Sequence, residues 1–194
     1  FNRGNVHIIG MRDIWYKTDY TTRDYATGFT KEQYEWLVQD LAVVPKDKMV
    51  VLCVHIPLFG SATKRGATGH YVKEVHQLLN EFKEAHVISG HTHYQRNYIH
   101  STYNIYEHNM GTVCGTWWSS NVCGDGTPNG YGVYTISGNT LKDWYYKATG
   151  YDPDMQIRAY DGGQTFYDPR LNQSKSAKQN YYSKYSWSAP GYII

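Results

Sequence analysis

One stretch of the chain, Met49-Val50-Val51-Leu52-Cys53-Val54, is almost continuously apolar, and it constrains the fold more than any other feature. A strand with one buried face alternates apolar and polar residues, whereas a strand buried on both faces has an unbroken apolar pattern. Strands of the second kind occur mainly in parallel sheets that are covered on both sides. The run therefore predicts a central strand of a layered α/β domain.

A helix is predicted shortly before this strand. Thr30 and Gln33 stand three residues apart, as the two members of a capping box do. Apolar side chains follow at helical spacing and predict one buried face: Tyr34, Leu37, Val38 and Leu41. A strand at Val6–Met11, a helix over about 71–82 and a short strand at Val87-Ile88 complete an alternating α/β pattern.

The pattern changes after residue 100. Tyr103–His108, Gly132–Ser137 and Leu141–Tyr146 indicate antiparallel strands, with a tight turn at Ser137-Gly138-Asn139-Thr140 between the last two. After Gly150 the composition becomes polar and rich in Tyr, Ser, Asn and Lys. We therefore expect one α/β part over residues 1–147 and an appended β-rich domain or tail over residues 148–194.

Near the start of the chain, the polar stretch over residues 16–28 indicates a loop.

Composition excludes some classes of function. The formal net charge is only +2 and the basic residues are scattered, which argues against a nucleic-acid partner. The sequence contains no stretch of about 18 apolar residues, so it does not predict a membrane span. The 20 Tyr and 6 Trp residues suit either the cover of a sheet or a surface that faces a sugar or a nucleotide. Cys114 and Cys123 are close enough in sequence for a disulfide, but the spacing alone does not establish one.

Three histidines directly follow the predicted buried strands: His55, His91 and His93. Ligands bind at the carboxyl ends of strands in open α/β sheets, so the two loops should converge on one site. We expect His91 and His93 to alternate in an extended loop, with both imidazoles on one side. A lone histidine is usually a hydrogen-bonded loop residue. Three of them placed in this way indicate a partial metal site, because imidazole suits Zn, Fe, Mn or Ni.

The motifs around these histidines resemble those of the calcineurin-like metallophosphoesterases. Gly90-His91-Thr92-His93 resembles the G-H-x-H motif of that family, and His55-Ile56-Pro57 resembles its H-x-P motif. The continuation through Arg96 is similar to the purple acid phosphatase version. The section from Gly111 to Tyr160 is similar to the tail region of secreted or periplasmic bacterial members. The resemblance implies a β-sandwich flanked by helices, of which this chain is the C-terminal part, and a secreted or periplasmic location.

The resemblance also implies a dinuclear centre of Mn, Fe or Zn ions about 3.5 Å apart, in which a metal-bridging hydroxide attacks the phosphorus of a phosphomonoester or phosphodiester. His55 and His91 would bind one metal and His93 the other. The D-x-H, G-D and G-N-H-[DE] motifs, which supply the remaining ligands in the family, are absent ahead of His55. Gly4-Asn5-Val6-His7 is a near-match that opens a strand instead of ending one, so we do not assign it as a ligand motif. We expect the missing motifs upstream of Phe1 in a longer protein, which leaves an incomplete ligand set here.

Two further residues are candidates for contact with the substrate phosphate. His70 lies in the Gly-rich loop after the H-x-P motif, although a position at a helix entry is the interpretation that we prefer. Arg96 could bind phosphate bidentately or form a structural ion pair.

Two other functions remain open. The loop around Trp117 and Trp118, together with the Tyr-rich tail, could make the chain a non-catalytic module that binds a glycan or a protein. A single-metal hydrolase would need a general base, for which the sequence offers no convincing candidate.

Overall fold

The computed structural model describes residues 1–16, 25–59, 71–114, 123 and 127–156, together with the backbone of residues 160–161 and 192–193. These residues form two compact units. The first unit consists of Phe1–Thr92, Arg96–Met110 and Thr135–Lys142, and the second of His93–Gln95, Gly111–Tyr134 and Asp143–Ile194. The predicted domain boundary between residues 147 and 148 stays a prediction.

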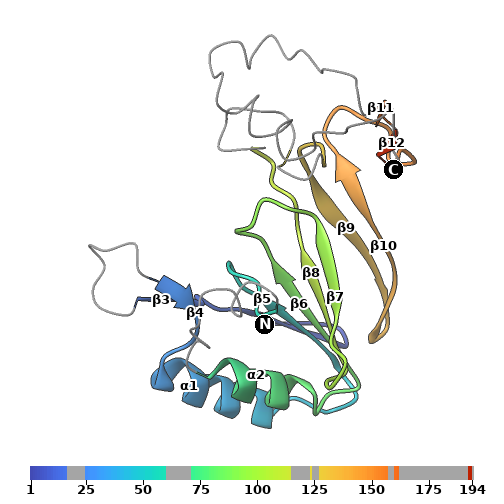
Figure 1. Cartoon of the computed structure of the whole chain (residues 1–194). Coiled ribbons are helices and arrows are strands. Elements are labelled where there is room, and N and C mark those ends of the chain that lie inside the picture. Colours follow the sequence, from blue (N-terminus) through green and yellow to red (C-terminus); the bar gives the residue numbers. More distant parts are fainter. Residues whose placement is uncertain are drawn as a thin grey trace. The chain divides into compact units, whose positions relative to one another are not determined.

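A six-stranded sheet forms the centre of the first unit (Figure 1). Its strand order is β1-β2-β5-β6-β8-β7, and the four inner strands run parallel. The strands are β1 (Asn2–Arg3), β2 (Val6–Gly10), β5 (Met49–Cys53), β6 (Glu84–Ser89), β8 (Ile105–Asn109) and β7 (Arg96–Ile99). The apolar run from Met49 is indeed a central strand, with neighbours on both sides, as its pattern predicted.

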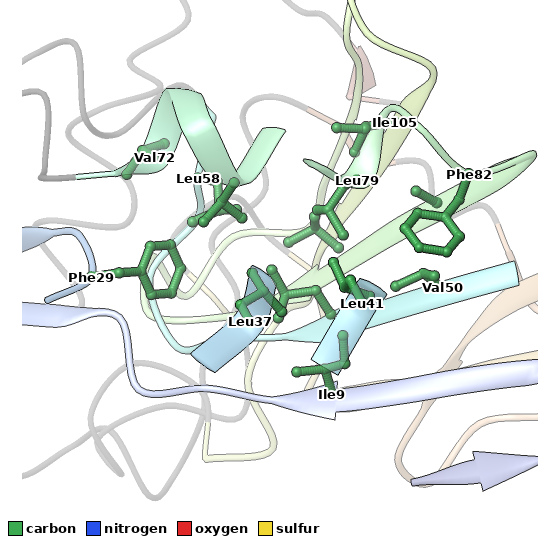
Figure 2. Packing of buried hydrophobic residues seen from close by; sticks show 14 of the residues in the cluster. Ile9, Phe29, Leu37, Leu41, Val50, Leu58, Val72, Leu79, Phe82 and Ile105 are labelled. Carbon is green, nitrogen blue, oxygen red and sulfur yellow. The ribbon is translucent and has the colours of Figure 1, made fainter. Parts of the chain in front are cut away.

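Two helices, α1 (Lys31–Ala42) and α2 (Val72–Leu79), cover one face of this sheet (Figure 1). The capping box at the start of α1 is confirmed. The backbone N–H of Gln33 donates to the Thr30 hydroxyl at 3.2 Å, and the backbone N–H of Thr30 donates to the side-chain oxygen of Gln33 at 2.9 Å. Leu37 and Leu41 pack into the core, whereas Val38 is 37% exposed, so its place in the predicted buried face was wrong. Figure 2 shows these leucines packed with residues of β2, β5 and α2.

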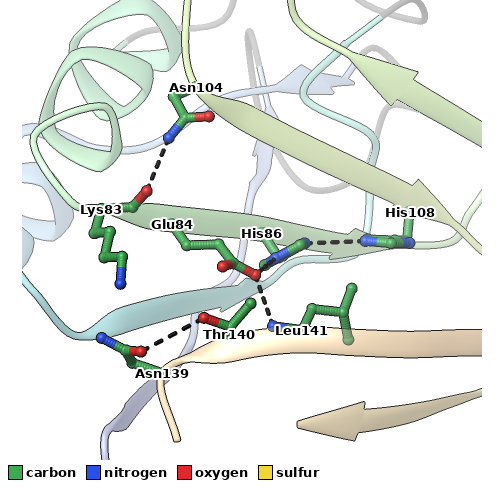
Figure 3. A network of polar contacts seen from close by, with 8 residues as sticks. All are labelled: Lys83, Glu84, His86, Asn104, His108, Asn139, Thr140 and Leu141. Atoms are coloured by element: carbon green, nitrogen blue, oxygen red, sulfur yellow. Dashed lines mark hydrogen bonds and ion pairs between the residues drawn. The ribbon is translucent and has the colours of Figure 1, made fainter. Parts of the chain in front are cut away.

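The opposite face of the sheet carries a smaller apolar cluster of Val6, Met49 and Val51, against which Leu141 packs. Leu141 belongs to a β-hairpin of β9 (Gly130–Ser137) and β10 (Thr140–Ala148), whose turn residue Gly138 has a φ of +63°. This turn confirms the predicted hairpin. The Leu141 amide donates to the Glu84 carboxylate at 2.8 Å (Figure 3).

Glu84 begins a polar chain beneath the hairpin tip (Figure 3). Its carboxylate lies 2.9 Å from Nε2 of His86, and Nδ1 of His86 lies 3.1 Å from Nε2 of His108. Burial, and next the neighbouring His86, lower the pKa of His108 to about 4. His108 is therefore neutral at ordinary pH, which suits a hydrogen-bonded network inside the fold.

The expectations about the other strands have different outcomes. β8 runs antiparallel to β7, as expected, but it also runs parallel to β6, which was not expected because residue alternation has the same form in both strand directions. β7 was not predicted, since Arg96-Asn97-Tyr98-Ile99 is largely exposed and lacks an apolar repeat. The stretch predicted as a loop over residues 16–28 contributes to a short hairpin of β3 (Ile14–Tyr16) and β4 (Tyr25–Thr27).

The described part of the second unit is β-rich. Tyr146 of β10 donates its hydroxyl to the Pro128 carbonyl at 2.8 Å, and a Cβ at Gly130 would lie only 2.7 Å from the same ring. Two short antiparallel strands, β11 (Tyr160–Asp161) and β12 (Tyr192–Ile193), lie farther along the chain. None of the described helices is both long and apolar enough to span a membrane.

Candidate metal centre

The structure brings His55 and His91 together at one edge of the sheet. β5 and β6 are parallel neighbours, so the loops that follow them begin side by side. Nε2 of His55 lies 3.1 Å from Nδ1 of His91, and the two ring centroids are 4.9 Å apart. His55 is exposed and His91 is half-buried, so a solute can reach this pair. The predicted convergence of the two loops is therefore seen for these two residues.

The backbone at the second loop is unusual. His91 and His93 have φ values of 65° and 56°, in the left-handed region that a side chain disfavours. The expectation of an extended loop was wrong, because this segment bends at each histidine instead of alternating. Left-handed residues of this kind cost about 1–3 kcal/mol and persist only where their surroundings hold them in place.

Asn109 supplies part of that support. It lies at the end of β8 and is fully buried. Its Nδ2 donates to the Gly90 carbonyl at 2.6 Å, and its Oδ1 accepts the Thr92 hydroxyl at 2.5 Å. Asn109 therefore bonds to the residues on both sides of His91.

Asp13 holds the start of the first loop. Its buried carboxylate accepts the amide of His55 at 2.9 Å, the amide of Ile56 at 2.9 Å and the Thr27 hydroxyl at 3.1 Å. Burial raises the pKa of Asp13, and these hydrogen bonds oppose the rise. The sequence indicated only a strand-end or loop position for Asp13, since nothing in its local pattern shows a contact forty residues away.

Glu107 holds the next part of the first loop, at Leu58 and Phe59, and is also fully buried. Its Oε1 accepts the Leu58 amide at 2.9 Å and the Ser89 hydroxyl at 2.7 Å, and its Oε2 accepts the Phe59 amide at 2.9 Å. Burial raises the pKa of Glu107 to about 7, against the effect of these three donors. Sequence reasoning missed this residue, although a carboxylate within the strand pattern Ile105-Tyr106-Glu107-His108-Asn109 could have drawn attention to it.

The His55–His91 pair fits one metal ion. Nitrogen ligands lie about 2.0–2.1 Å from zinc. Two such ligands at right angles to each other are separated by roughly 3 Å, and at the tetrahedral angle by roughly 3.4 Å. The observed separation of 3.1 Å lies between these values, and it is also a hydrogen-bond distance. Within the part of the chain that the structure describes, no group of three or more His, Cys, Asp or Glu side chains is arranged to hold a metal. The pair can therefore supply two ligands of a larger set.

The other candidates have different outcomes. His93 belongs to the second unit and is half-buried there. His70, Trp117 and Trp118 lie outside the described residues. Arg96 is exposed on β7, with its guanidinium 3.5 Å from the Tyr98 hydroxyl.

His7 of the near-match motif has a structural role. Its ring lies 2.7 Å from the Asp40 carboxylate and 3.0 Å from the Asn2 amide oxygen. Cys114 and Cys123 are not oxidised to a disulfide, and the Thr112 hydroxyl lies 3.0 Å from the Cys114 sulfur. The disulfide that their spacing permitted is therefore not formed in this structure.

A comparison with known families finds one match. The family model described as C terminal of Calcineurin-like phosphoesterase matches residues 107–188. No curated protein matches the chain. The matched residues begin with Glu107 in β8 and include the stretch whose similarity to the tail of this family was noted in the sequence. His55, His91, His93 and Arg96 lie upstream of them. Over these residues the chain is similar to the C-terminal portion of the calcineurin-like phosphoesterases.

Proposed function

We propose that this chain is part of a metal-dependent phosphoesterase that hydrolyses a small phosphomonoester or phosphodiester. The observation that carries the proposal is the 3.1 Å separation of the His55 and His91 nitrogens at the carboxyl edge of the sheet. The family match over residues 107–188 supports it independently, because it concerns a different part of the chain. In this proposal the six-stranded sheet and its helices are one half of the family's β-sandwich.

His55 and His91 would hold one metal ion, through Nε2 and Nδ1 respectively, and His93 would hold a second one. To bind the ion, each imidazole of the pair must present a lone pair, and the exposed position of His55 leaves it accessible from solution. The remaining ligands, carboxylates above all, would come from residues outside this sequence. Mn, Fe or Zn ions bound there would supply Lewis-acid activation of water and neutralise charge on phosphoryl oxygens.

Arg96 and His70 are proposed to contact the phosphate of the substrate. Arg96 is exposed on β7, and the planar guanidinium of an arginine matches the geometry of a phosphate group. His70 is placed here only by its position in the sequence, after the H-x-P motif. We also propose a secreted or periplasmic location, which rests on the similarity of the tail region to family members found there.

The test is hydrolysis of an aryl phosphate by a longer protein that contains this chain. We expect chelator-sensitive hydrolysis that is lost in His91→Ala and retained in His100→Gln, a histidine of the same unit outside the pair. Hydrolysis that survives His91→Ala would exclude the proposed role of this residue. Glycan binding indifferent to chelators, with no hydrolysis, would instead support a non-catalytic module.

A further inference from the structure

The two loops that carry His55 and His91 are joined by side chains of a third strand, β8. Glu107 and Asn109 stand two residues apart on this strand, so their side chains project from the same face of the sheet. Both are fully buried. Neither belongs to the metal-binding motifs, yet each bonds to a loop that carries one of the two histidines.

Glu107 connects the two loops directly. Its carboxylate accepts the amides of Leu58 and Phe59, which belong to the loop that starts at His55. The same carboxylate accepts the hydroxyl of Ser89, the last residue of β6 before Gly90 and His91. One buried group therefore fixes both loops.

Asn109 continues this connection by bonding to the Gly90 carbonyl and the Thr92 hydroxyl around His91. The amide of Met110 also donates to the Ser89 carbonyl at 2.8 Å, which holds β8 against the end of β6. A shift of β8 would therefore move both loops, and the histidine separation depends on this strand.

We propose that Glu107 is a positioning residue that sets the separation of the His55 and His91 imidazoles before any metal binds. This role rests on the proposed function, because the separation of the two imidazoles matters only if they bind a metal ion together. Replacing a group that hydrogen-bonds to a metal ligand and orients it typically weakens metal binding by 10–100-fold. Glu107 acts less directly than such a group, because it bonds to residues of the loops and not to the imidazoles themselves.

Glu107→Gln is the informative replacement. It preserves the shape of the side chain but places an amide NH2 opposite a backbone N–H or the Ser89 hydroxyl, so at least one hydrogen bond must break. His108→Asn is the matched control, because His108 is on the same strand, is equally buried and faces the polar chain on the other side of the sheet. Ser89→Ala is a milder variant that removes only the bond between Glu107 and the second loop.

The first measurement uses the metal-free chain, treated with chelator, at a temperature where all variants are folded. We expect a nuclear Overhauser contact between the His55 and His91 rings in the unmodified chain and in His108→Asn, and its loss in Glu107→Gln. Absence of the contact in the unmodified chain, or its persistence in Glu107→Gln, would overturn the proposal. If Glu107→Gln does not fold, the decision falls to Ser89→Ala, where an undiminished contact would overturn it.

The second measurement is titration with Zn²⁺ alone. We expect about tenfold weaker binding in Glu107→Gln, and binding within about twofold of the unmodified chain in His108→Asn. Equal weakening in both variants would show that affinity follows stability, and would overturn a specific role for Glu107. Zn²⁺ binding that is unaffected by His55→Ala and His91→Ala would contradict the proposed function, while the ring contact of the metal-free chain would still decide the role of Glu107.

Discussion

Replacing Glu107 by Gln should change how the stability of the chain depends on pH. Burial raises the pKa of this carboxyl from its ordinary value of 4.5 to about 7 in the folded protein. Between these two pH values the folded chain keeps a proton that the unfolded chain has released. The free energy of unfolding must therefore fall as pH rises through this interval.

The size of this effect follows from the pKa values. A tenfold change in proton affinity corresponds to about 1.4 kcal/mol. The rise from 4.5 to about 7 therefore amounts to roughly 3 kcal/mol of stability lost between pH 4.5 and pH 7. Glutamine does not titrate, so the variant lacks this loss. It does lose at least one hydrogen bond, which lowers its stability by about 1–3 kcal/mol at every pH.

Urea unfolding of both proteins, followed by circular dichroism between pH 4 and pH 8.5, measures this difference directly. Other groups that titrate in both proteins, such as His108, cancel when the two unfolding free energies are subtracted. We expect the advantage of the unmodified chain over Glu107→Gln to shrink by about 3 kcal/mol as pH rises across the interval. A difference that is independent of pH, or that grows with pH, would refute the reasoning. It would mean that the three donors stabilise the carboxylate more than burial destabilises it.

Three further predictions concern the rest of the first unit. Burial, with a smaller effect of His100, lowers the pKa of His76 to about 4, so folding loses stability as pH falls from about 6.5 to 4. His76→Phe keeps the stack on the Phe59 ring, whose centroid lies 4.3 Å away, and removes an Nε2 that lacks a hydrogen-bond partner among the described residues. The melting temperature of this variant should therefore rise, and the rise should be larger at pH 5 than at pH 7. Thr30→Ala breaks the capping box and should lower the free energy of unfolding by about 1 kcal/mol, whereas an unchanged value would mean that the cap is not formed in solution. Leu52→Ala opens a cavity at a fully buried position of β5 and should cost about 2–5 kcal/mol in urea unfolding, and a loss below 1 kcal/mol would contradict the packing shown here.

The features that the sequence predicted well are those decided by local chemistry. The capping box at Thr30 depends on two residues three positions apart, and it forms as expected. The apolar run from Met49 required cover on both faces, and β5 is indeed a central strand. The position of His55 and His91 directly after buried strands predicted their convergence, because parallel neighbours end at the same edge of a sheet.

The features that the sequence did not predict depend on contacts between distant residues. Asp13 bonds to the loop at His55, and Glu107 bonds to the same loop from β8, about fifty residues away in sequence. No local pattern distinguishes these carboxylates from ordinary polar residues near strand ends. The left-handed backbone at His91 was missed for a similar reason, since Asn109 on another strand bonds to the residues on either side of it.

The most direct test of the account is a crystal structure of the chain grown with Mn²⁺, with anomalous scattering used to locate the ion. We expect an anomalous peak about 2.0–2.2 Å from both Nε2 of His55 and Nδ1 of His91, as metal–imidazole bonds require. A peak elsewhere, with the two imidazoles still in direct hydrogen-bond contact at saturating Mn²⁺, would contradict it.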